Sequence, residues 1–435
     1  MFNVVGKRIP RYDGVGHVTG RTRYIDDIRL PGMLVVKALR SPVARGNILG
    51  LNVSRAERIP GVAAILTHKD VPFNRFGLVP DQPVLAENEV RYVGQPIAAV
   101  AAVDEDTALE ALAAIEIEIE ELPPVFDPFV AMQPDAPRVR AEGNLYVFPG
   151  GSPYRKMRLG DVEAALQEAD LIVEGTYRTA TNEHVPMETQ CAIGEVDPGG
   201  HVTVYTVSQD HYFHLGQLAG VLQMPLNKVR FVGGTVGGGF GAKNDMHAEP
   251  ICALLALKSG RPVKWRWTRE EEMLYSTFRG WWQFDFKDGV KKNGRIIARQ
   301  IRTVHDSGGY SSLGPYVVDK NAFLVAGPYF IPNIWIDGYC VYTNKPPASS
   351  MRGFGIINGN FAHEVQMDRV AEVLGMDPWE VRFINAWREG EHTVTKKVLN
   401  AVGVIETMQA LAGLAGVPLP DRLLSLKSID RRDES

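Results

Sequence analysis

GGTVGGGFGAK, residues 233–243, is the most distinctive segment of this 435-residue sequence, and a β-rich run over residues 228–236 leads into it. Glycine has no Cβ, so glycines at this density let peptide N–H groups approach an oxyanion or an oxo group closely. Gly237–Ala242 also matches the pattern G-x-G-x-x-A, which binds dinucleotides when it follows a strand. The residues alone leave three interpretations: a structural turn, a nicotinamide dinucleotide site and a backbone cradle for another ligand.

The dinucleotide interpretation lacks two of its expected parts. An acidic residue should follow about 20 residues later, at the end of the next strand. The next strand is predicted over residues 262–268 and does not end in an acidic residue. The first carboxylate after it is Glu270. A helix should also open directly after the glycines, whereas Asn244 and Asp245 favour a turn. The sequence therefore favours a backbone cradle over a nicotinamide site.

A second glycine-rich segment, PPASSMRGFGIINGNF, covers residues 346–361. Arg352 lies there among small residues, with Phe354 two positions later. An arginine in such a loop offers forked donors to a phosphate-like or pterin-like group. The alternative is an arginine paired with a nearby carboxylate such as Glu364.

Other polar residues favour structural roles. His184 and Glu188 flank a proline, which predicts core structure with a satisfied acid more than catalysis. Four tryptophans predict packing against sheets more than base stacking, because the sequence has no basic excess or basic stripe of the kind that a nucleic-acid surface requires. These are Trp265, Trp267, Trp281 and Trp282.

His211 and His214 are spaced i and i+3 on a helix predicted over residues 209–222, for which Ser208 is the predicted N-cap. Two histidines at this spacing could begin a metal site. No convincing third ligand follows, so the pattern favours a helix surface. No metal ligand is assigned in this sequence.

Composition and charge argue against nucleic-acid binding, zinc or iron–sulfur sites and membrane insertion. Lys and Arg number 47 against 51 for Asp and Glu, a net charge of −4, so a nucleic-acid partner is not expected. The three cysteines form no C-x-x-C pair, so this chain offers no zinc or iron–sulfur site, and their sparse count is typical of a reducing compartment. No apolar leader or 18-residue apolar run is present. We expect a cytoplasmic protein that does not enter membranes.

Alternating runs and turn residues predict a compact mixed domain over residues 1–130. Its helix begins after Asp104, a good N-cap residue. Ile115, Ile117 and Ile119 alternate with glutamates, which is typical of a half-buried strand.

The rest of the chain predicts three further parts. Residues 131–156 are rich in proline and glycine and predict a linker. A larger domain is predicted over residues 157–420, in which Asp377-Pro378 is a helix start signal. Residues 421–435 predict a solvated polar tail.

The long motifs resemble a known family. VGGTVGGGFGAK and the later SSMRGFGIINGNFAHEVQMDRVAEVLGMDPWEVRFIN resemble the molybdenum hydroxylases, the xanthine dehydrogenase and aldehyde oxidase family. VTGRTRYIDDIRLPGMLVVKALRSPVARGNI and VRYVGQPIAAVAA are similar to its opening hammerhead domain. The matches run in order from Val5 to about Asn385. The resemblance implies an α+β fold, a hammerhead domain followed by the first molybdopterin-binding domain.

The same resemblance implies roles for single residues. Gln209 takes the catalytic and cofactor-binding position whose amide hydrogen-bonds the apical oxo ligand of molybdenum. The backbone cradle beside the metal's oxygen ligands is formed by Gly239, Phe240 and Gly241. Arg352 and Gly353 fall in the arginine–glycine motif near the cofactor.

Three positions concern the substrate. Phe354 occupies the place whose ring packs against an aromatic substrate. Asn244 stands where xanthine-oxidising members carry glutamate, and Lys320 where they carry arginine, so xanthine itself is not the expected substrate. The resemblance implies hydroxylation of an electron-poor carbon of a heteroaromatic or aldehyde substrate, with water as the oxygen source.

One family feature is missing. The catalytic base is a glutamate in a late Gly-Glu motif, and in the second half of this sequence Gly-Glu occurs only in REGEH, residues 388–392, where its context is wrong. The resemblance therefore implies half an active site, completed by a second molybdopterin subunit that carries the base. It also implies a molybdenum–molybdopterin cofactor in the cytosine dinucleotide form, with [2Fe–2S] clusters and FAD on separate iron–sulfur and FAD subunits.

Two other functions compete with this interpretation. The chain could be a non-catalytic assembly subunit of the same fold, or a nicotinamide-dependent dehydrogenase. Asn244 and Lys320 keep polar chemistry in the expected pocket and favour the enzyme.

Overall fold

The computed structural model describes residues 3–417, so the predicted polar tail over residues 421–435 lies outside the described residues. The chain forms two compact units, and each is built from two separate stretches of sequence. The first unit combines Met1–Pro123 with Glu183–Thr277, and the second combines Pro124–Asn182 with Phe278–Ser435.

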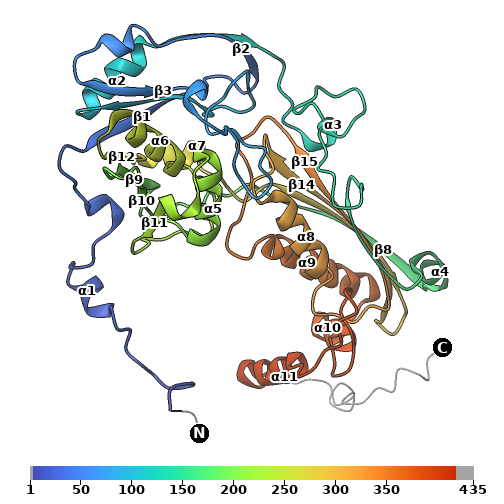
Figure 1. Cartoon of the computed structure of the whole chain (residues 1–435). Coiled ribbons are helices and arrows are strands. Elements are labelled where there is room, and N and C mark those ends of the chain that lie inside the picture. Colours follow the sequence, from blue (N-terminus) through green and yellow to red (C-terminus); the bar gives the residue numbers. More distant parts are fainter. Residues whose placement is uncertain (1–2, 418–435) are drawn as a thin grey trace. The chain divides into compact units, whose positions relative to one another are not determined.

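The first unit is organised around a seven-stranded sheet in the order β11-β10-β9-β12-β1-β5-β3 (Figure 1). Its strands are β1 (Leu34–Arg40), β3 (Val62–Leu66), β5 (Pro96–Ala102), β9 (Cys191–Val196), β10 (Val202–Thr206), β11 (Val229–Gly233) and β12 (Val263–Arg266). β1 and β12 pair in parallel, with Leu34 opposite Val263. This pairing joins the two stretches of sequence into one sheet.

Helices cover both faces of this sheet. Alternate residues of β5 enter different cores, because side chains point to opposite faces along a strand. Ala99 and Ala101 pack with α6 (Glu249–Ser259) and α5 (His211–Leu222), whereas Ala98 and Val100 pack with α2 (Glu105–Ala114). Burial on both faces explains why β5 is apolar throughout.

Smaller elements complete the first unit. A three-stranded sheet has the order β4-β2-β6, and the glutamates of β6 face solvent between half-buried isoleucines, as predicted. The other helices and strands of this unit are α1 (Gly14–Val18), α7 (Arg269–Tyr275), β2 (Gly46–Asn52), β4 (Glu89–Val90), β6 (Glu116–Glu121) and the short 3-10 helices η1 (Ile25–Asp27), η2 (Ala56–Arg58), η3 (His68–Asp70) and η4 (Leu226–Lys228).

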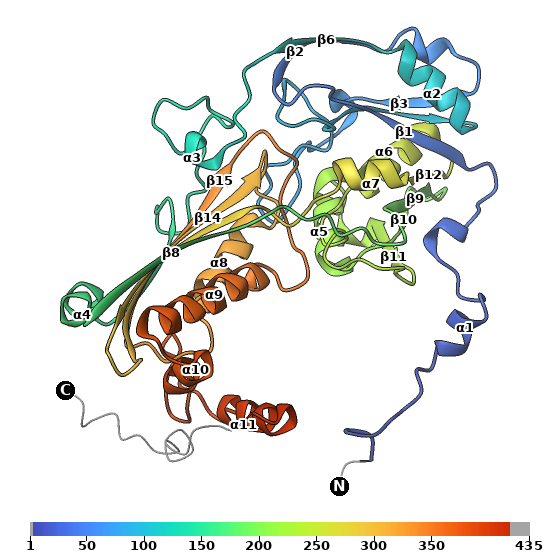
Figure 2. The same ribbon diagram turned by 180° about the vertical axis from the view of Figure 1, so that it is seen from behind.

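The second unit contains a five-stranded sheet in the order β7-β15-β14-β13-β8. Its strands are β7 (Arg155–Leu159), β8 (Leu171–Thr179), β13 (Trp282–Val290), β14 (Ile296–Gly308) and β15 (Asn333–Tyr342). α8 (Gly314–Leu324) and α9 (Ile356–Leu374) pack on this sheet (Figure 2). The remaining helices are α3 (Pro128–Ala131), α4 (Val162–Glu168), α10 (Pro378–Asn385) and α11 (Val404–Ala415).

The α+β prediction is confirmed by these sheets and helices. Asp104 caps α2 by accepting from the Thr107 N–H, and Asp377 caps α10 by accepting from two peptide N–H groups. Trp265, Trp267 and Trp282 are buried against sheets, as predicted. Within residues 3–417, no helix is both long enough and apolar enough to cross a membrane.

One cap prediction is wrong. α5 begins at His211 with Asp210 as its N-cap residue, two positions later than Ser208. The Ser208 hydroxyl is engaged elsewhere, because it lies 2.9 Å from the ring of His214 and accepts from the Asp210 N–H. Gln209 therefore lies in a loop and not in the helix.

Candidate cofactor site

The glycine loop, residues 233–243, packs directly against polar side chains of the first unit. A Cβ at Gly237 would lie 2.7 Å from Cβ of Glu188, and a Cβ at Gly239 would overlap the side-chain amide of Gln209. Glycine is required at both positions because Glu188 and Gln209 pack so closely against the loop backbone that a Cβ would not fit. The loop is therefore shaped by its own surroundings before any ligand binds.

A buried ion pair anchors the loop. The Glu188 carboxylate accepts from the Gly237 N–H at 2.7 Å and from the Lys243 ammonium at 2.9 Å. Burial lowers the pKa of Lys243, whose side chain is fully buried, while the neighbouring Glu188 opposes that shift. The prediction that Glu188 is a satisfied acid is confirmed for Oε2, whereas Oε1 is buried and accepts no hydrogen bond from the described residues. Through Oε2, Glu188 links the middle of the loop at Gly237 to its end at Lys243.

Behind this pair, Gln190 ties a second carboxylate to the loop. Its side-chain amide donates to the carbonyl of Ala242 at 2.9 Å, and its peptide N–H donates to Glu272 at 2.7 Å. Burial raises the pKa of Glu272, which is fully buried. These contacts fix the end of the glycine loop.

Gln209 is oriented by the same loop. Its Oε1 accepts from the peptide N–H groups of Gly241 at 2.9 Å and Lys243 at 3.3 Å, and its own N–H donates to the Lys243 carbonyl at 2.8 Å. The residue is exposed. With Oε1 committed, the amide hydrogens on Nε2 are the part of Gln209 left to meet a ligand, since they donate to no described residue.

His214 links the loop that contains Gln209 to the residue that follows the glycine loop. Its Nε2 lies 2.9 Å from the carbonyl oxygen of Asn244, and its Nδ1 lies 2.9 Å from the Ser208 hydroxyl. A carbonyl only accepts, so Nε2 carries the proton and Nδ1 accepts from Ser208. His214 is fully buried, so the prediction that it lies on a helix surface is wrong. The ring is buried because it connects Ser208, which precedes Gln209, to Asn244, which follows the glycine loop.

Phe240 sits at the exposed edge of this arrangement. Its φ of 56° lies in the left-handed region, which is costly for a residue with a Cβ, and its side chain is 49% exposed. Met187 and Tyr212 are also strongly exposed. Strain and exposed apolar surface at one place are typical of a site that a ligand or a partner completes.

The second group of candidates lies in the second unit. Gly353, Phe354 and Gly355 are three consecutive residues with positive φ, so the chain turns sharply there. The Arg279 guanidinium holds this turn by donating to the Arg352 carbonyl at 2.7 Å. The Arg352 side chain is exposed and forms no ion pair with any residue among 3–417.

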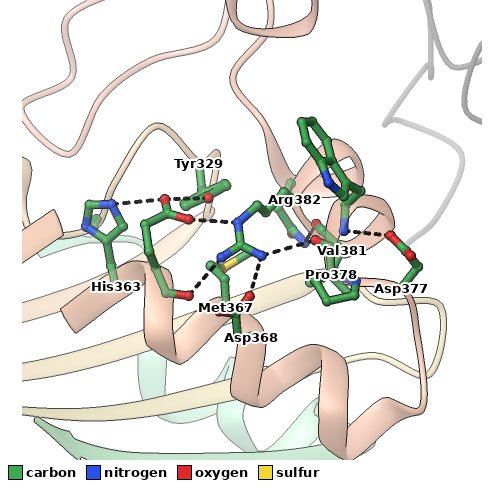
Figure 3. Close-up of polar contacts among 12 residues, drawn as sticks. Tyr329, His363, Met367, Asp368, Asp377, Pro378, Val381 and Arg382 are labelled. Atoms are coloured by element: carbon green, nitrogen blue, oxygen red, sulfur yellow. Dashed lines mark hydrogen bonds and ion pairs between the residues drawn. The ribbon is translucent and has the colours of Figure 1, made fainter. Parts of the chain in front are cut away.

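The alternative pairing of Arg352 with Glu364 is wrong. Glu364 instead accepts from Arg382 and from the Tyr329 hydroxyl, each at 2.7 Å (Figure 3). Burial raises the pKa of Glu364, but hydrogen bonds from His363, Tyr329 and Arg382 outweigh it and lower that pKa to about 2. Arg352 remains available for a ligand.

Lys320 and Phe354 lie on adjoining elements. Lys320 is exposed on α8, and the next residue, Asn321, donates to the Gly355 carbonyl at 2.9 Å. The neighbouring Asp319 does not pair with Lys320, because it pairs with Arg155 at 3.0 Å.

The structure thus assembles the candidates in two sets. The first unit brings together Gln209, Gly239, Phe240, Gly241 and Asn244. The second unit brings together Arg352, Gly353, Phe354 and Lys320. The roles of Lys243 and His214 were missed from sequence. Lys243 meets Glu188 across 55 residues of chain, so no local pattern connects them.

The first set suits an oxo-bearing group. The peptide N–H groups of Gly238, Gly239 and Phe240 donate to no residue within the described range, and the Gln209 amide stands beside them. Several unpaired donors on a fixed backbone fit acceptor oxygens, and they fit a metal ion itself poorly. Among residues 3–417, no group of three or more His, Cys, Asp or Glu side chains could hold a metal ion.

Comparison with known proteins gives consistent matches. The model of the molybdopterin cofactor-binding domain matches residues 146–386, and that of the aldehyde oxidase and xanthine dehydrogenase a/b hammerhead domain matches residues 19–123. The nicotinate dehydrogenase large molybdopterin subunit of Eubacterium barkeri is 37% identical, over 94% of this chain and 95% of that protein.

Other relatives are longer. A probable xanthine dehydrogenase subunit of Bacillus subtilis is 42% identical, over 86% of this chain but 49% of its own length. The aldehyde oxidoreductase from Desulfovibrio gigas superposes with a TM-score of 0.89 and 30% identity, covering 94% of this chain and 46% of that one. The chain therefore spans nearly all of one relative and about half of the other two.

Proposed function

The chain belongs to the aldehyde oxidase and xanthine dehydrogenase family of molybdenum oxidoreductases, and on that premise we propose that it is the large molybdopterin subunit of a split molybdenum hydroxylase. One observation carries the proposal. The Gln209 amide is locked through Oε1, so that its Nε2 hydrogens and the unpaired N–H groups of Gly239 and Phe240 form one set of donors.

When bound, the molybdenum–molybdopterin cofactor supplies the oxygen-transfer and redox chemistry. The residues of this chain orient it. Gln209 would hold an oxygen ligand of that group through its Nε2 hydrogens, and the N–H groups of Gly239 and Phe240 would donate to further oxygens. Arg352 offers its guanidinium to the pterin, which we propose to be the cytosine dinucleotide form. Because these donors are held before binding, they need no reorganisation during the reaction.

The proton of the activated water must leave through a base that the described residues of this chain do not present. Glu188 lies against the loop, but its Oε2 is committed to Gly237 and Lys243 and its Oε1 is buried, and Glu272 is fully buried. A general base must reach the proton that it abstracts. We therefore assign the base to a glutamate of a second molybdopterin subunit.

Electron acceptors also belong to partner subunits in this proposal. Cys191, Cys252 and Cys340 are free, buried and far apart in sequence, and burial raises the pKa of Cys191 to about 12. Thiols held in this state make poor cluster ligands. The [2Fe–2S] clusters and the FAD are therefore assigned to separate subunits, and the free thiols suit a cytoplasmic enzyme.

The substrate that fits best is a planar heteroaromatic acid. Phe354 offers a ring for stacking, and Lys320 offers a cation that pairs with no carboxylate among residues 3–417. The relative named nicotinate dehydrogenase supports the same substrate class.

Metal analysis of the purified native complex tests the proposal. We expect about one molybdenum per copy of this chain in the complex, and little molybdenum or turnover in the chain expressed alone. A complex that assembles without molybdenum would favour an assembly subunit. A lone chain that is replete with molybdenum and active would refute the split site.

A further inference from the structure

Helix α11 presents an apolar face that the described part of the chain leaves uncovered. Its sequence, VIETMQALAGLA, has one buried residue, Ala412. Leu411 is 51% exposed and Leu414 is 87% exposed. A 12-residue helix is marginal in water without packing of its apolar face. The exposed leucines therefore indicate a surface that another protein segment covers.

A groove runs beside this helix within the second unit. It encloses about 470 Å³ between α11 and the region of α9 and α10. Its lining is largely apolar and comes from Tyr329, Pro378, Trp379, Ala386, Val404 and Met408. Figure 3 shows the side chains of three residues that line this groove, Tyr329, Pro378 and Arg382. An apolar groove that continues onto an exposed apolar helix has the composition of an interface core.

The polar edge of the groove is an ionic network with one exposed carboxylate. Arg382 is shared between Glu364 and Asp368, with contacts of 2.7 Å to each, and His363 lies 3.3 Å from Glu364. The side chain of Asp368 is 58% exposed, so a further cation can approach this carboxylate. A covering protein would gain from a basic residue opposite Asp368.

We propose that α11 and this groove are the docking surface for the second molybdopterin subunit, through an apolar contact face that carries a basic residue opposite Asp368. The inference rests on the proposed function. The relatives of known structure carry about as much chain again as this protein, which covers 46% of the Desulfovibrio gigas enzyme. The cofactor-domain match ends at residue 386, so α11 lies beyond it. An apolar helix outside the matched domain suits contact with the part that the longer relatives carry on one chain.

The test uses the full chain and the second molybdopterin subunit recovered with it from the native complex. Leu411→Glu combined with Leu414→Glu places two carboxylates on the apolar face. We expect the affinity for that subunit to fall by about 100-fold, because central apolar anchors carry much of the binding energy. Asp368→Asn should weaken binding by about threefold and reduce its dependence on salt.

A matched control places two glutamates on the other unit. Leu109→Glu combined with Leu257→Glu changes leucines that are 48% and 41% exposed, and binding should stay within about twofold of the wild type. Because Leu414 lies almost wholly in solvent, its replacement leaves the fold intact, and thermal unfolding of each variant verifies this. Amide hydrogen exchange in α11 should slow on complex formation.

The outcomes separate the two proposals. If the wild-type chain binds the second molybdopterin subunit and the α11 variant binds equally well, the docking surface is wrong while the split enzyme stands. A native complex without such a subunit removes the proposed function first. Self-association through Leu414 that persists in the complex would make a second copy the occupant and overturn the inference.

Discussion

The glycine-containing loops of the two units are built in opposite ways. In the glycine loop of the first unit, side chains point inward and hold the backbone, through Glu188, Gln209 and His214. In the loop of the second unit, the backbone is held by Arg279, while the Arg352 side chain extends outward without a partner among residues 3–417. The first loop therefore offers fixed peptide donors, and the second offers an adjustable cation.

This difference separates two kinds of recognition. A backbone cradle tolerates little change, because each donor position depends on several buried contacts. A solvent-exposed arginine can reach ligands of different shape at the cost of side-chain entropy. We expect substitutions around the first loop to affect stability and turnover, and substitutions around the second to affect affinity.

The largest expected effect comes from Lys243→Met, which tests whether the first loop depends on its buried ion pair. The change leaves the Glu188 carboxylate without its cation, and breaking such a pair costs about 3–5 kcal/mol. Urea unfolding measures the loss. Lys258→Met, which breaks an exposed pair with Asp70, should cost less than about 1 kcal/mol. Equal losses would show that the loop pair is no stronger than a surface pair.

Gln209→Ala tests whether the first loop acts on turnover. It removes one donor whose position is fixed beforehand, so turnover of the assembled enzyme should fall by roughly 10- to 1000-fold. Substrate affinity should change less than turnover. Arg352→Ala is the contrasting variant and should mainly lower the molybdenum content. Unchanged turnover in Gln209→Ala would mean that its role is assigned wrongly.

Lys320→Met tests whether the exposed lysine of the second unit binds an anionic group of the substrate. Loss of a charge-assisted hydrogen bond to an anionic substrate should cost about 1.5–3 kcal/mol of binding. The loss should appear in apparent affinity for a heteroaromatic acid and shrink for the uncharged amide. Equal losses for acid and amide would leave Lys320 as a structural lysine.

Ser208→Ala tests which ring nitrogen of His214 carries the proton and how much the Ser208 contact stabilises the fold. It removes the hydroxyl that donates to Nδ1 of His214, at an expected cost of about 1 kcal/mol. Nitrogen NMR of the wild-type chain should show Nδ1 without a proton and Nε2 protonated. Ser152→Ala, which removes a hydroxyl from a turn of the second unit, should leave those histidine signals unchanged. Protonation of Nδ1 in the wild type would contradict this donation from Ser208.

The smallest expected effect concerns pH. Burial raises the pKa of Glu272 above its ordinary value of 4.5, so the folded chain binds more protons than the unfolded chain from that pH upward. The free energy of unfolding should therefore fall as pH rises through this window. Glu272→Gln keeps an acceptor for the Gln190 N–H and should flatten that slope. Parallel pH profiles for the two proteins would show that Glu272 does not titrate differently on folding.

Much of the fold was predictable because its signals are local. The apolar run of β5 and the caps at Asp104 and Asp377 depend on residues within a few positions of each other. The failures share another cause. Ser208 would cap a helix in isolation, but its hydroxyl bonds the ring of His214, which the distant carbonyl of Asn244 holds in place.

The site follows the same division. Gln209, Phe240 and Arg352 were identified because they lie in recognisable motifs. Their supports were not, because Arg382 takes Glu364 from a different helix and Lys243 meets Glu188 from a distant part of the sequence. Motifs indicate which residues meet the ligand, whereas the contacts that hold those residues depend on the folded chain.

The pairing of β1 with β12 has a consequence for biosynthesis. Leu34 leaves the ribosome long before its neighbour Val263, and the chain builds part of the second unit in between. Domains generally fold as units during synthesis, at about 5–20 residues per second. The first unit therefore cannot close its sheet until β12 has emerged, and the early strands must wait about 10 seconds or more with an open edge. A nascent chain stalled before Val263 should engage chaperones at the open edge of β1, whereas one stalled after Thr277 should engage them only through β7 and β8, whose partner strands have not yet been made.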